Sequence, residues 1–243
     1  MIMGYSRFFK DWLEVVGSYD RPYRTEFGDW DTYEVPIYAD ALPHLAKWIK
    51  KRRAEHYQTM VFCGGSTGSG KSNNGIKLCR YIEPNWNIEK NYILTKKALF
   101  SRVLDEGETA KVMLIDEASY MLNSKNSMRN DDKSIEILFD IIRSWSPVTV
   151  MCAPDQGRVN HGIIETHVDL LLKVPEHSPI AGVDRRGFVD IYTKLRRDWG
   201  KPAFAYQCTT LVDQIGPRVK KRYEDIKRQT QREFLLKELE KCE

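Results

Sequence analysis

The stretch that decides the fold is GGSTGSGKS at residues 64–72. From Gly65 onward it fits G-x-x-x-x-G-K-[ST], the phosphate-binding loop of nucleoside triphosphatases. Glycines let backbone N–H groups turn inward around phosphate oxygens, the lysine reaches the β- and γ-phosphates, and the serine hydroxyl completes a Mg²⁺ shell. We therefore predict ATP and Mg²⁺ as cofactors, bound by Gly65, Ser66, Thr67, Gly68, Ser69, Gly70, Lys71 and Ser72.

The residues on either side of this loop supply the setting that it needs. Residues 59–63 (TMVFC) form a short apolar run rich in strand-forming side chains, and residues 71–81 place Ile76, Leu78 and Cys79 as buried candidates on a helix. A strand, a glycine-rich turn and a helix are the context in which the motif binds phosphate, aided by the positive end of the helix dipole. A flexible Gly/Ser linker would not have such neighbours.

A second motif, KVMLIDEA at residues 111–118, is an apolar strand that ends in two carboxylates. Asp116 is expected to hold Mg²⁺ through water, and Glu117 to orient and deprotonate the attacking water. The alternative, a buried strand before an exposed acidic turn, loses weight beside a phosphate loop. A small-molecule kinase must exclude water, so the Asp-Glu pair favours hydrolysis over a kinase reaction.

Composition places the chain among globular proteins. Its 243 residues suffice for one large α/β domain, and 42% hydrophobic and 30% charged residues are ordinary for a soluble protein. The longest apolar runs are too short to cross a bilayer, and no signal-peptide pattern opens the chain. Five scattered cysteines predict reduced, mostly buried thiols. We expect a cytoplasmic protein (the host cytosol if it is viral), with transient recruitment to a virion vertex or membrane.

Charge is distributed unevenly although the net value is only +4. Residues 11–40 hold eight acids and two bases, whereas residues 194–232 hold eleven bases and four acids. Three interpretations stay open: the two regions are head-to-tail surfaces of a ring, the basic region faces DNA phosphates, or it is a solvated face.

The chain divides into three parts: a helical and extended segment at 1–55 packed on the core, an ATPase core at 56–215, and a charged helix at 216–243. Strands that alternate with helices in the core predict an α/β fold with a mostly parallel central sheet flanked by helices. Expected strands lie at 59–63, 91–94, 111–115, 148–152, 170–174 and 188–193. Expected helices lie at 8–16, 41–54, 71–81, 96–104, 135–145 and 218–241, and residues 18–40 are expected to be turn-rich.

A polar turn follows the strand at 148–152. In P-loop ATPases with an additional catalytic glutamate, a polar residue at this place senses the γ-phosphate. Gln156 is the first candidate for this sensor and Asp155 the second. The alternative is a plain proline-containing turn.

The order of these motifs resembles the FtsK/HerA superfamily of RecA-like motor ATPases. The chain looks most like its small viral and mobile-element members, the genome-packaging and zonula-occludens-toxin-like ATPases, over roughly residues 56–195. The resemblance implies a RecA-like P-loop fold of the class with the additional catalytic glutamate (ASCE). It also implies a homo-oligomeric ring, expected to be a hexamer, that hydrolyses ATP at subunit interfaces and moves DNA through its centre.

Members of this superfamily supply an arginine in trans to the neighbour's γ-phosphate, where it stabilises charge in the transition state. Arg143 matches this finger by position, with Arg158, Arg185 and Arg186 as competitors; a surface arginine that closes a helix is the alternative. The chain lacks the transmembrane helix of phage-export members and the extra DNA-reading domains of septal translocases. Both departures favour a soluble packaging or transfer motor, with a portal or membrane-associated partner.

The polar segment 120–133 is the candidate channel lining, touching DNA phosphates through Asn123, Lys125, Asn126, Arg129 and Asn130. The alternative is an ordinary solvated loop. We expect a translocase of double-stranded DNA held by its backbone. An assembly or secretion ATPase that acts on protein, or a nucleotide switch with little turnover, remains the alternative function.

Overall fold

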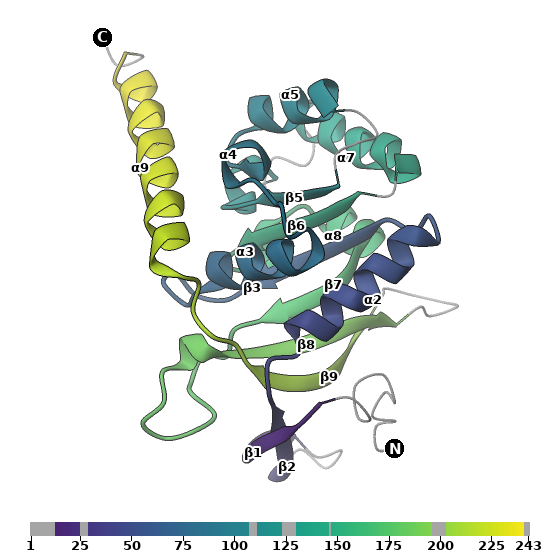
Figure 1. The fold of residues 1–243 in the computed structure, drawn as a ribbon, viewed down its shortest axis with the longest axis vertical. Helices are drawn as coiled ribbons and strands as arrows, with labels where there is room; N and C mark the ends of the chain where they lie inside the picture. Colours follow the sequence, from purple (N-terminus) through teal and green to yellow (C-terminus); the bar gives the residue numbers. More distant parts are fainter. Residues whose placement is uncertain are drawn as a thin grey trace.

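The computed structural model describes residues 13–24, 29–106, 111–122, 130–145, 147–195 and 203–240. The described strands form one sheet of nine strands in the order β1-β2-β9-β8-β7-β3-β6-β5-β4. Helices cover both faces of this sheet, and the last helix rises along one side of the molecule (Figure 1). The arrangement is that of an α/β protein, as the sequence predicted.

Five strands form the parallel half of the sheet. They are β7 (Val168–Lys173), β3 (Thr59–Gly64), β6 (Val148–Ala153), β5 (Val112–Ile115) and β4 (Tyr92–Ile93). The strand before the phosphate loop, β3, therefore lies between β7 and β6, and β6 separates it from β5 with its two carboxylates. One strand inserted between these two motifs, in a mostly parallel sheet, gives the chain a RecA-like P-loop fold.

The other four strands extend the sheet beyond β7. They are β8 (Phe188–Leu195), β9 (Ala203–Leu211), β2 (Trp30–Tyr38) and β1 (Val15–Arg24). β8 is antiparallel to both β7 and β9, β2 pairs in parallel with β9, and β1 closes the edge as an antiparallel hairpin with β2. The pairing of β2 with β9 joins the N-terminal part to the same sheet as the phosphate loop.

Alternate residues of the buried strands pack into two hydrophobic layers, one on each face of the sheet. Val61 and Cys63 of β3 pack beneath α2 (Leu42–Ala54) and α3 (Lys71–Ile82), whereas Met60 and Phe62 face the opposite layer. The helices of that layer are α5 (Lys96–Glu106), α7 (Asn130–Ile142) and α8 (His161–His167). Because side chains alternate across a strand, one short run anchors both layers and holds the loop after β3 in place.

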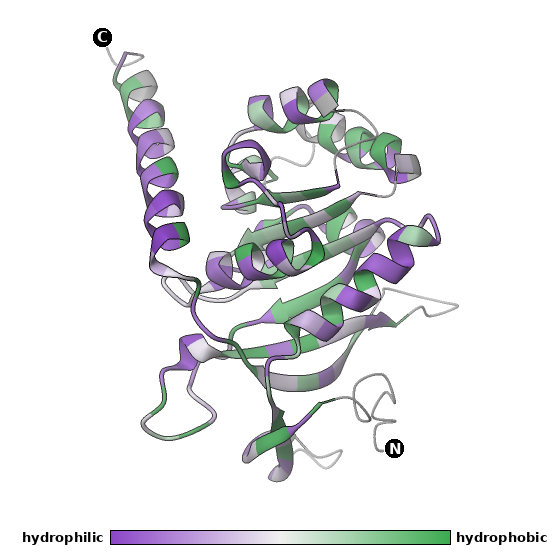
Figure 2. Cartoon of the chain, viewed as in Figure 1, coloured by the Kyte–Doolittle hydropathy of each residue, from purple (hydrophilic) through white to green (hydrophobic). Residues whose placement is uncertain are grey.

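Short elements complete the chain: α4 (Ile88–Asn91), α6 (Ala118–Met121), η3 (Arg143–Trp145), η4 (Gln156–Arg158) and η5 (Arg185–Gly187). The last helix, α9 (Pro217–Glu240), confirms the predicted C-terminal helix. Figure 2 shows α9 as mostly hydrophilic, in contrast to the apolar central strands. Among the described residues, no helix combines the length and apolar character needed to span a bilayer.

The N-terminal part differs from the prediction. Of the helix predicted at 8–16, residues 8–12 lie outside the described residues, whereas Val15 and Val16 belong to β1. The turn-rich prediction for residues 18–40 is wrong at residues 18–24, which continue β1, and at residues 30–38, which form β2 with Val35 and Ile37 fully buried. β-Branched residues in alternation favour a strand, and pairing with β9 buries one face of it. The three-part division of the chain stays a prediction.

Two further elements, β9 and α8, were not anticipated from the sequence. In β9, five consecutive residues are only half-buried, so the strand shows no clear apolar alternation. The thiols of Cys63, Cys79, Cys152 and Cys208 are free and buried, as predicted. Cys242 lies outside the described residues.

Candidate functional site

The phosphate loop leaves the end of β3 and turns directly into α3. Gly65, Gly68 and Gly70 have φ values of 149°, 76° and 93°, a region that side chains with a Cβ rarely adopt. At Gly65 a Cβ would also lie 2.7 Å from Ser69 Oγ. These glycines are therefore required by the backbone path, and the loop forms the tight turn that the motif predicts.

Two polar side chains of the loop lie inside this turn. Lys71 is only 7% exposed. Its side chain folds back so that Nζ donates to the carbonyl oxygen of Ser66 at 3.3 Å. Ser69 is fully buried, and its Oγ has no hydrogen-bond partner among the described residues. A buried cation tethered by one bond and a buried hydroxyl without a partner are donors available to a bound oxyanion.

The two motifs meet at Ser72 and Asp116. Ser72 Oγ donates to Asp116 Oδ1 at 2.9 Å, and Tyr92 OH donates to Asp116 Oδ2 at 2.6 Å. Burial and the Asp116 carboxylate raise the pKa of Tyr92, so its phenol stays a donor. Asp116 is only 1% exposed, and a hydrogen bond holds each of its two oxygens in place.

Glu117 follows Asp116 at the point where β5 ends. Its backbone is left-handed, with φ 50° and ψ 41°, and it precedes the short helix α6. A non-glycine residue in this conformation is uncommon and costs free energy. The Glu117 side chain is one quarter exposed, as expected for a group that would act on water.

Two residues of α9, Tyr223 and Lys227, reach this site although nothing in the sequence indicated it. Lys227 Nζ lies 2.6 Å from Glu117 Oε1 and 3.6 Å from Asp116 Oδ2. Burial alone would lower the pKa of Lys227, but the carboxylates of Asp116 and Glu117 outweigh it and raise the pKa, so the ammonium is charged. Tyr223 meets the ring of Tyr92 edge-on, with centroids 5.6 Å apart.

A hollow of about 840 Å³ opens beside the loop, lined in part by Gly65, Ser66, Gln156 and Arg185. The Nε2 atom of Gln156 is buried without a hydrogen-bond partner among the described residues. Asp155 instead accepts from the Gly157 N–H at 3.2 Å and caps the short helix η4. Gln156 thus has a free donor next to the loop, which agrees with its predicted role better than Asp155 does.

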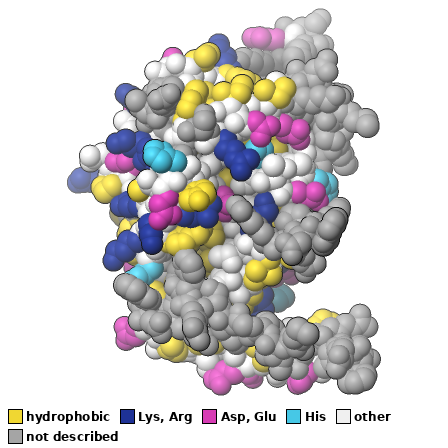
Figure 3. Space-filling view, turned by 90° about the vertical axis from the view of Figure 1, so that its right-hand side faces the viewer, with side chains coloured by type: hydrophobic (Ala, Val, Ile, Leu, Met, Phe, Trp, Pro, Cys, Tyr) yellow, Lys and Arg dark blue, Asp and Glu magenta, His cyan; other side chains and the backbone are white. Residues whose placement is uncertain are grey.

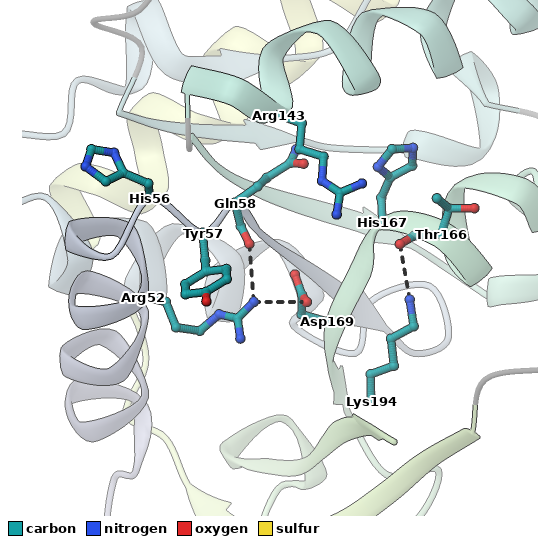
Figure 4. A pocket seen from close by; sticks show the side chains of 9 residues that line it. All are labelled: Arg52, His56, Tyr57, Gln58, Arg143, Thr166, His167, Asp169 and Lys194. Atoms are coloured by element: carbon teal, nitrogen blue, oxygen red, sulfur yellow. Dashed lines mark hydrogen bonds and ion pairs between the residues drawn. The ribbon is translucent and has the colours of Figure 1, made fainter. Parts of the chain in front are cut away.

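The arginine candidates fall at different edges of the sheet. Arg185 lines the hollow beside the loop, and Arg186 lies against Gly70, where an added Cβ would be 3.6 Å from the Cβ of Arg186. Arg158 is exposed at the end of η4, which follows β6. Arg143 lies at the opposite edge, where the parallel strands begin (Figure 4). The structure therefore does not bring Arg143 to the phosphate loop of its own chain.

Around Arg143, basic residues from several elements line a pocket. Arg52 pairs with Asp169 at 3.3 Å, and Lys194 donates to the carbonyl oxygen of Glu165 at 2.6 Å (Figure 4). Burial lowers the pKa of His167 in the same pocket. Figure 3 looks onto this edge and shows Lys and Arg side chains gathered across its middle.

The channel residues predicted from the sequence cannot be placed in the same way. Asn123, Lys125, Asn126 and Arg129 lie outside the described residues, and only the backbone of Asn130 is described, as the first residue of α7. Tyr120, at the start of the segment, is 82% exposed. The channel lining stays a prediction.

The donors of the loop fit a Mg²⁺–triphosphate group. The positive-φ glycines form a concave turn, Ser69 Oγ lacks a partner, and Lys71 is tethered by a single bond. Ser72 and Asp116 provide the hydroxyl and carboxylate oxygens that Mg²⁺ prefers. In this arrangement Lys71 and the loop would hold phosphate oxygens, and Ser72 with Asp116 would hold the metal.

No protein-family model matches the chain, and no curated protein matches it. Solved structures that it resembles include the N-terminal domain of zonular occludens toxin from Neisseria meningitidis, with 12% identity and a TM-score of 0.39. That match covers 56% of this chain and 83% of the other. The genome packaging NTPase B204 from Sulfolobus turreted icosahedral virus 2, in complex with AMPPCP, has 15% identity, a TM-score of 0.38 and coverages of 57% and 93%. The FIGL-1 AAA domain has 18% identity, a TM-score of 0.37 and coverages of 55% and 50%.

Proposed function

We propose that this chain is an ATP-hydrolysing motor that moves double-stranded DNA, in the manner of FtsK/HerA-type packaging or transfer ATPases. The observation that carries the ATPase part is the hydrogen bond between Ser72 and Asp116, with Glu117 next in the chain. It brings the phosphate loop, the metal carboxylate and a candidate base into one site across β6. A kinase would not need the second carboxylate.

The residues have distinct roles in this proposal. Bound Mg²⁺–ATP would supply the scissile phosphoanhydride and neutralise part of its charge. Loop N–H groups and Lys71 would hold the phosphate oxygens, while Ser72 and Asp116 orient the metal. Glu117 would accept a proton from water at one of its carboxylate oxygens, and Gln156 would donate from Nε2 toward the terminal phosphate.

The DNA part of the proposal rests on the motif order and on charge. The edge opposite the ATP site carries Arg52, Arg143 and Lys194 in one pocket, with the last turn of α2 beside it. That turn adds Lys51 and Arg53 to the same edge. Several cations on one surface are suited to a polyanion such as DNA. A ring with an arginine supplied in trans is part of the same proposal, and Arg143, Arg158, Arg185 and Arg186 remain the candidates.

The test is steady-state ATP hydrolysis with and without double-stranded DNA, beside the Glu117→Gln variant. We expect DNA to stimulate hydrolysis by wild-type protein. In Glu117→Gln, hydrolysis should fall by at least about 10²-fold, the scale of general-base catalysis, while ATP binding is kept. Glu176→Gln is the matched control, because it removes the same charge from a glutamate outside the metal site, in the hollow beside the loop.

Two results would change the proposal. Hydrolysis that depends on Glu117 but ignores DNA would favour an assembly or secretion ATPase that acts on protein partners. ATP binding without turnover, in the presence or absence of DNA, would favour a nucleotide switch. Both outcomes would leave the P-loop fold intact and would reject the DNA motor.

A further inference from the structure

Helix α9 crosses the candidate ATP site of its own chain. Lys227 contacts both carboxylates of the site, at 2.6 Å from Glu117 Oε1 and 3.6 Å from Asp116 Oδ2. One helical turn earlier, Tyr223 packs edge-on against Tyr92, whose hydroxyl donates to Asp116 Oδ2. A single helix thus contacts the predicted metal carboxylate and the candidate base.

This contact is held by more than one ion pair. Val219, Tyr223 and Ile226 are partly buried against the hydrophobic layer that contains α2 and α3. Arg222 forms an ion pair with Glu89 of α4. Lys227 itself is only 20% exposed on its side chain. The first half of α9 is therefore docked, whereas Phe234, Leu235 and Leu239 near its end are exposed.

The charges of the site explain why a lysine lies there. Asp116 and Glu117 are adjacent carboxylates, and Asp116 is almost fully buried. Removing anions from water without a counter-charge is strongly unfavourable. The ammonium of Lys227 supplies this counter-charge for both groups in the absence of a metal. It does so next to the hydroxyl and carboxylate that would hold Mg²⁺.

We propose that Lys227 is the resident cation of the ATP site and that Mg²⁺ binding and the docking of α9 oppose each other. This inference rests on the proposed ATP site but not on DNA. An ammonium and a divalent cation repel when they share one pair of carboxylates. Mg²⁺ therefore binds more weakly while Lys227 is in place, and by linkage bound Mg²⁺ weakens the docking of α9 to the same extent.

The same contact holds Glu117 inactive. Glu117 Oε1 accepts a 2.6 Å hydrogen bond from Lys227 Nζ, so the ammonium occupies the position beside this oxygen that an attacking water would need. Release of Lys227 frees Glu117 to accept a proton from water. The docked helix is therefore the resting state of the site, and the competent state has Lys227 withdrawn from Glu117.

The first test uses Lys227→Met, which keeps the length of the apolar stem and removes the charge. Binding of a non-hydrolysable ATP analogue is measured across a Mg²⁺ titration, without DNA. We expect half-saturation at a Mg²⁺ concentration lower by at least about fivefold, the lower end of ordinary coupling between two sites. Lys220→Met, an equal charge change at an exposed position of α9, should leave the titration unchanged.

The second readout follows α9 itself. Amide hydrogen exchange in residues 217–230 of the wild-type protein should become faster when Mg²⁺ and the analogue are added together, but not with the analogue alone. Slower exchange under these conditions would overturn the proposal, because it would make α9 part of the closed, active site. A Lys227→Met protein with unchanged or weaker Mg²⁺ binding would overturn it as well.

A charge exchange provides a variant that leaves Lys227 in place. Arg222→Glu removes the ion pair with Glu89 and should shift the Mg²⁺ titration in the same direction as Lys227→Met, by less. Glu89→Arg combined with Arg222→Glu should return the titration toward wild type. Failure of the pair to restore it would exclude docking of α9 as the cause. None of these readouts depends on hydrolysis, so a chain that binds Mg²⁺–ATP without moving DNA still tests the inference.

Discussion

Ser72 Oγ donates a 2.9 Å hydrogen bond to Asp116 Oδ1, joining the first turn of α3 to the end of β5 across the intervening strand β6. The two residues lie 44 positions apart in the sequence. Their contact depends on the strand order β3-β6-β5, because this order sets the distance between the end of β3, where the phosphate loop begins, and the end of β5. Variants that remove this hydrogen bond therefore test both the fold and the proposed metal site.

Ser72→Ala is expected to weaken Mg²⁺ binding more than it weakens the fold. The variant removes one predicted metal ligand, and loss of a hydrogen bond to a charged group costs about 1.5–3 kcal/mol, or roughly tenfold or more in affinity. Ser72→Thr keeps the hydroxyl that the motif allows and should bind Mg²⁺ like wild type. Calorimetry of Mg²⁺ binding in the presence of an ATP analogue measures both. Equal affinity in the alanine variant would remove Ser72 from the metal site.

Gly75 tests how tightly α3 lies on the sheet. A Cβ at this position would be 2.9 Å from Leu114 Cδ1, closer than real Cβ contacts, and 3.0 Å from Cys152 Sγ, tighter than nine in ten of them. Gly75→Ala should therefore destabilise the protein by about 1–3 kcal/mol, despite the better helix propensity of alanine. Chemical denaturation measures the change in the free energy of unfolding.

Gly216→Ala is the matched control for this variant. No heavy atom lies within 4 Å of a Cβ at Gly216, and its φ is outside the positive range. We expect its free energy of unfolding to stay within about 0.5 kcal/mol of wild type. A Gly75→Ala protein as stable as Gly216→Ala would mean that α3 moves away from β5 and β6 without cost.

Much of the site could be predicted because its motifs are local. The phosphate loop needs a strand before it and a helix after it, and both signals are present within residues 59–81. The apolar run before the carboxylate pair likewise indicates a strand that ends at Asp116. The parallel direction of the central strands could also be expected, since alternating strands and helices build a parallel sheet. These features depend on neighbours in the sequence.

What could not be predicted depends on contacts between distant segments. Lys227 and Glu117 are 110 residues apart. Lys227 lies in a charged helix whose sequence predicts exposure to solvent along its whole length. Arg143 follows α7 in the expected place, but α7 returns to the edge where the strands begin, far from the loop. Motif order alone cannot tell which edge of a sheet a residue reaches.

His167 predicts a pH dependence of stability. Burial lowers its pKa below the ordinary value of 6.5, and Arg143 and Lys194 lower it further, against the opposing effect of Asp140 and Glu136. The folded state therefore binds fewer protons than the unfolded state as the pH falls from above 6.5 toward the lowered pKa. Stability decreases over this window and is fully present above it.

Replacement of this histidine isolates its share of the effect. His167→Phe, beside the ring of Phe139, cannot titrate, so its free energy of unfolding should fall less steeply than that of wild type between about pH 7.5 and 5.0. Urea denaturation at several pH values measures both slopes. Parallel slopes would mean that His167 titrates equally in the folded and unfolded states.

The basic edge opposite the ATP site gives the last prediction. Lys50 and Lys51, exposed in the last turns of α2, lie next to the pocket that holds Arg52 and Lys194. If DNA contacts this edge, Lys50→Gln with Lys51→Gln should reduce the salt dependence of DNA binding by about one unit of log–log slope per lysine. Fluorescence anisotropy of a labelled duplex, titrated at several salt concentrations, measures the slope.

Lys220→Gln with Lys221→Gln is the control, since it removes the same charge from exposed positions of α9. Long-range attraction depends on net charge and should change alike in both variants, whereas direct phosphate contacts release counterions only where they are made. A lower slope in the α2 variant alone would therefore place DNA at the edge where the strands begin. Equal slopes in the two variants would mean that this edge makes no direct contact, and a lower slope in the α9 variant alone would place DNA on the side of the ATP site.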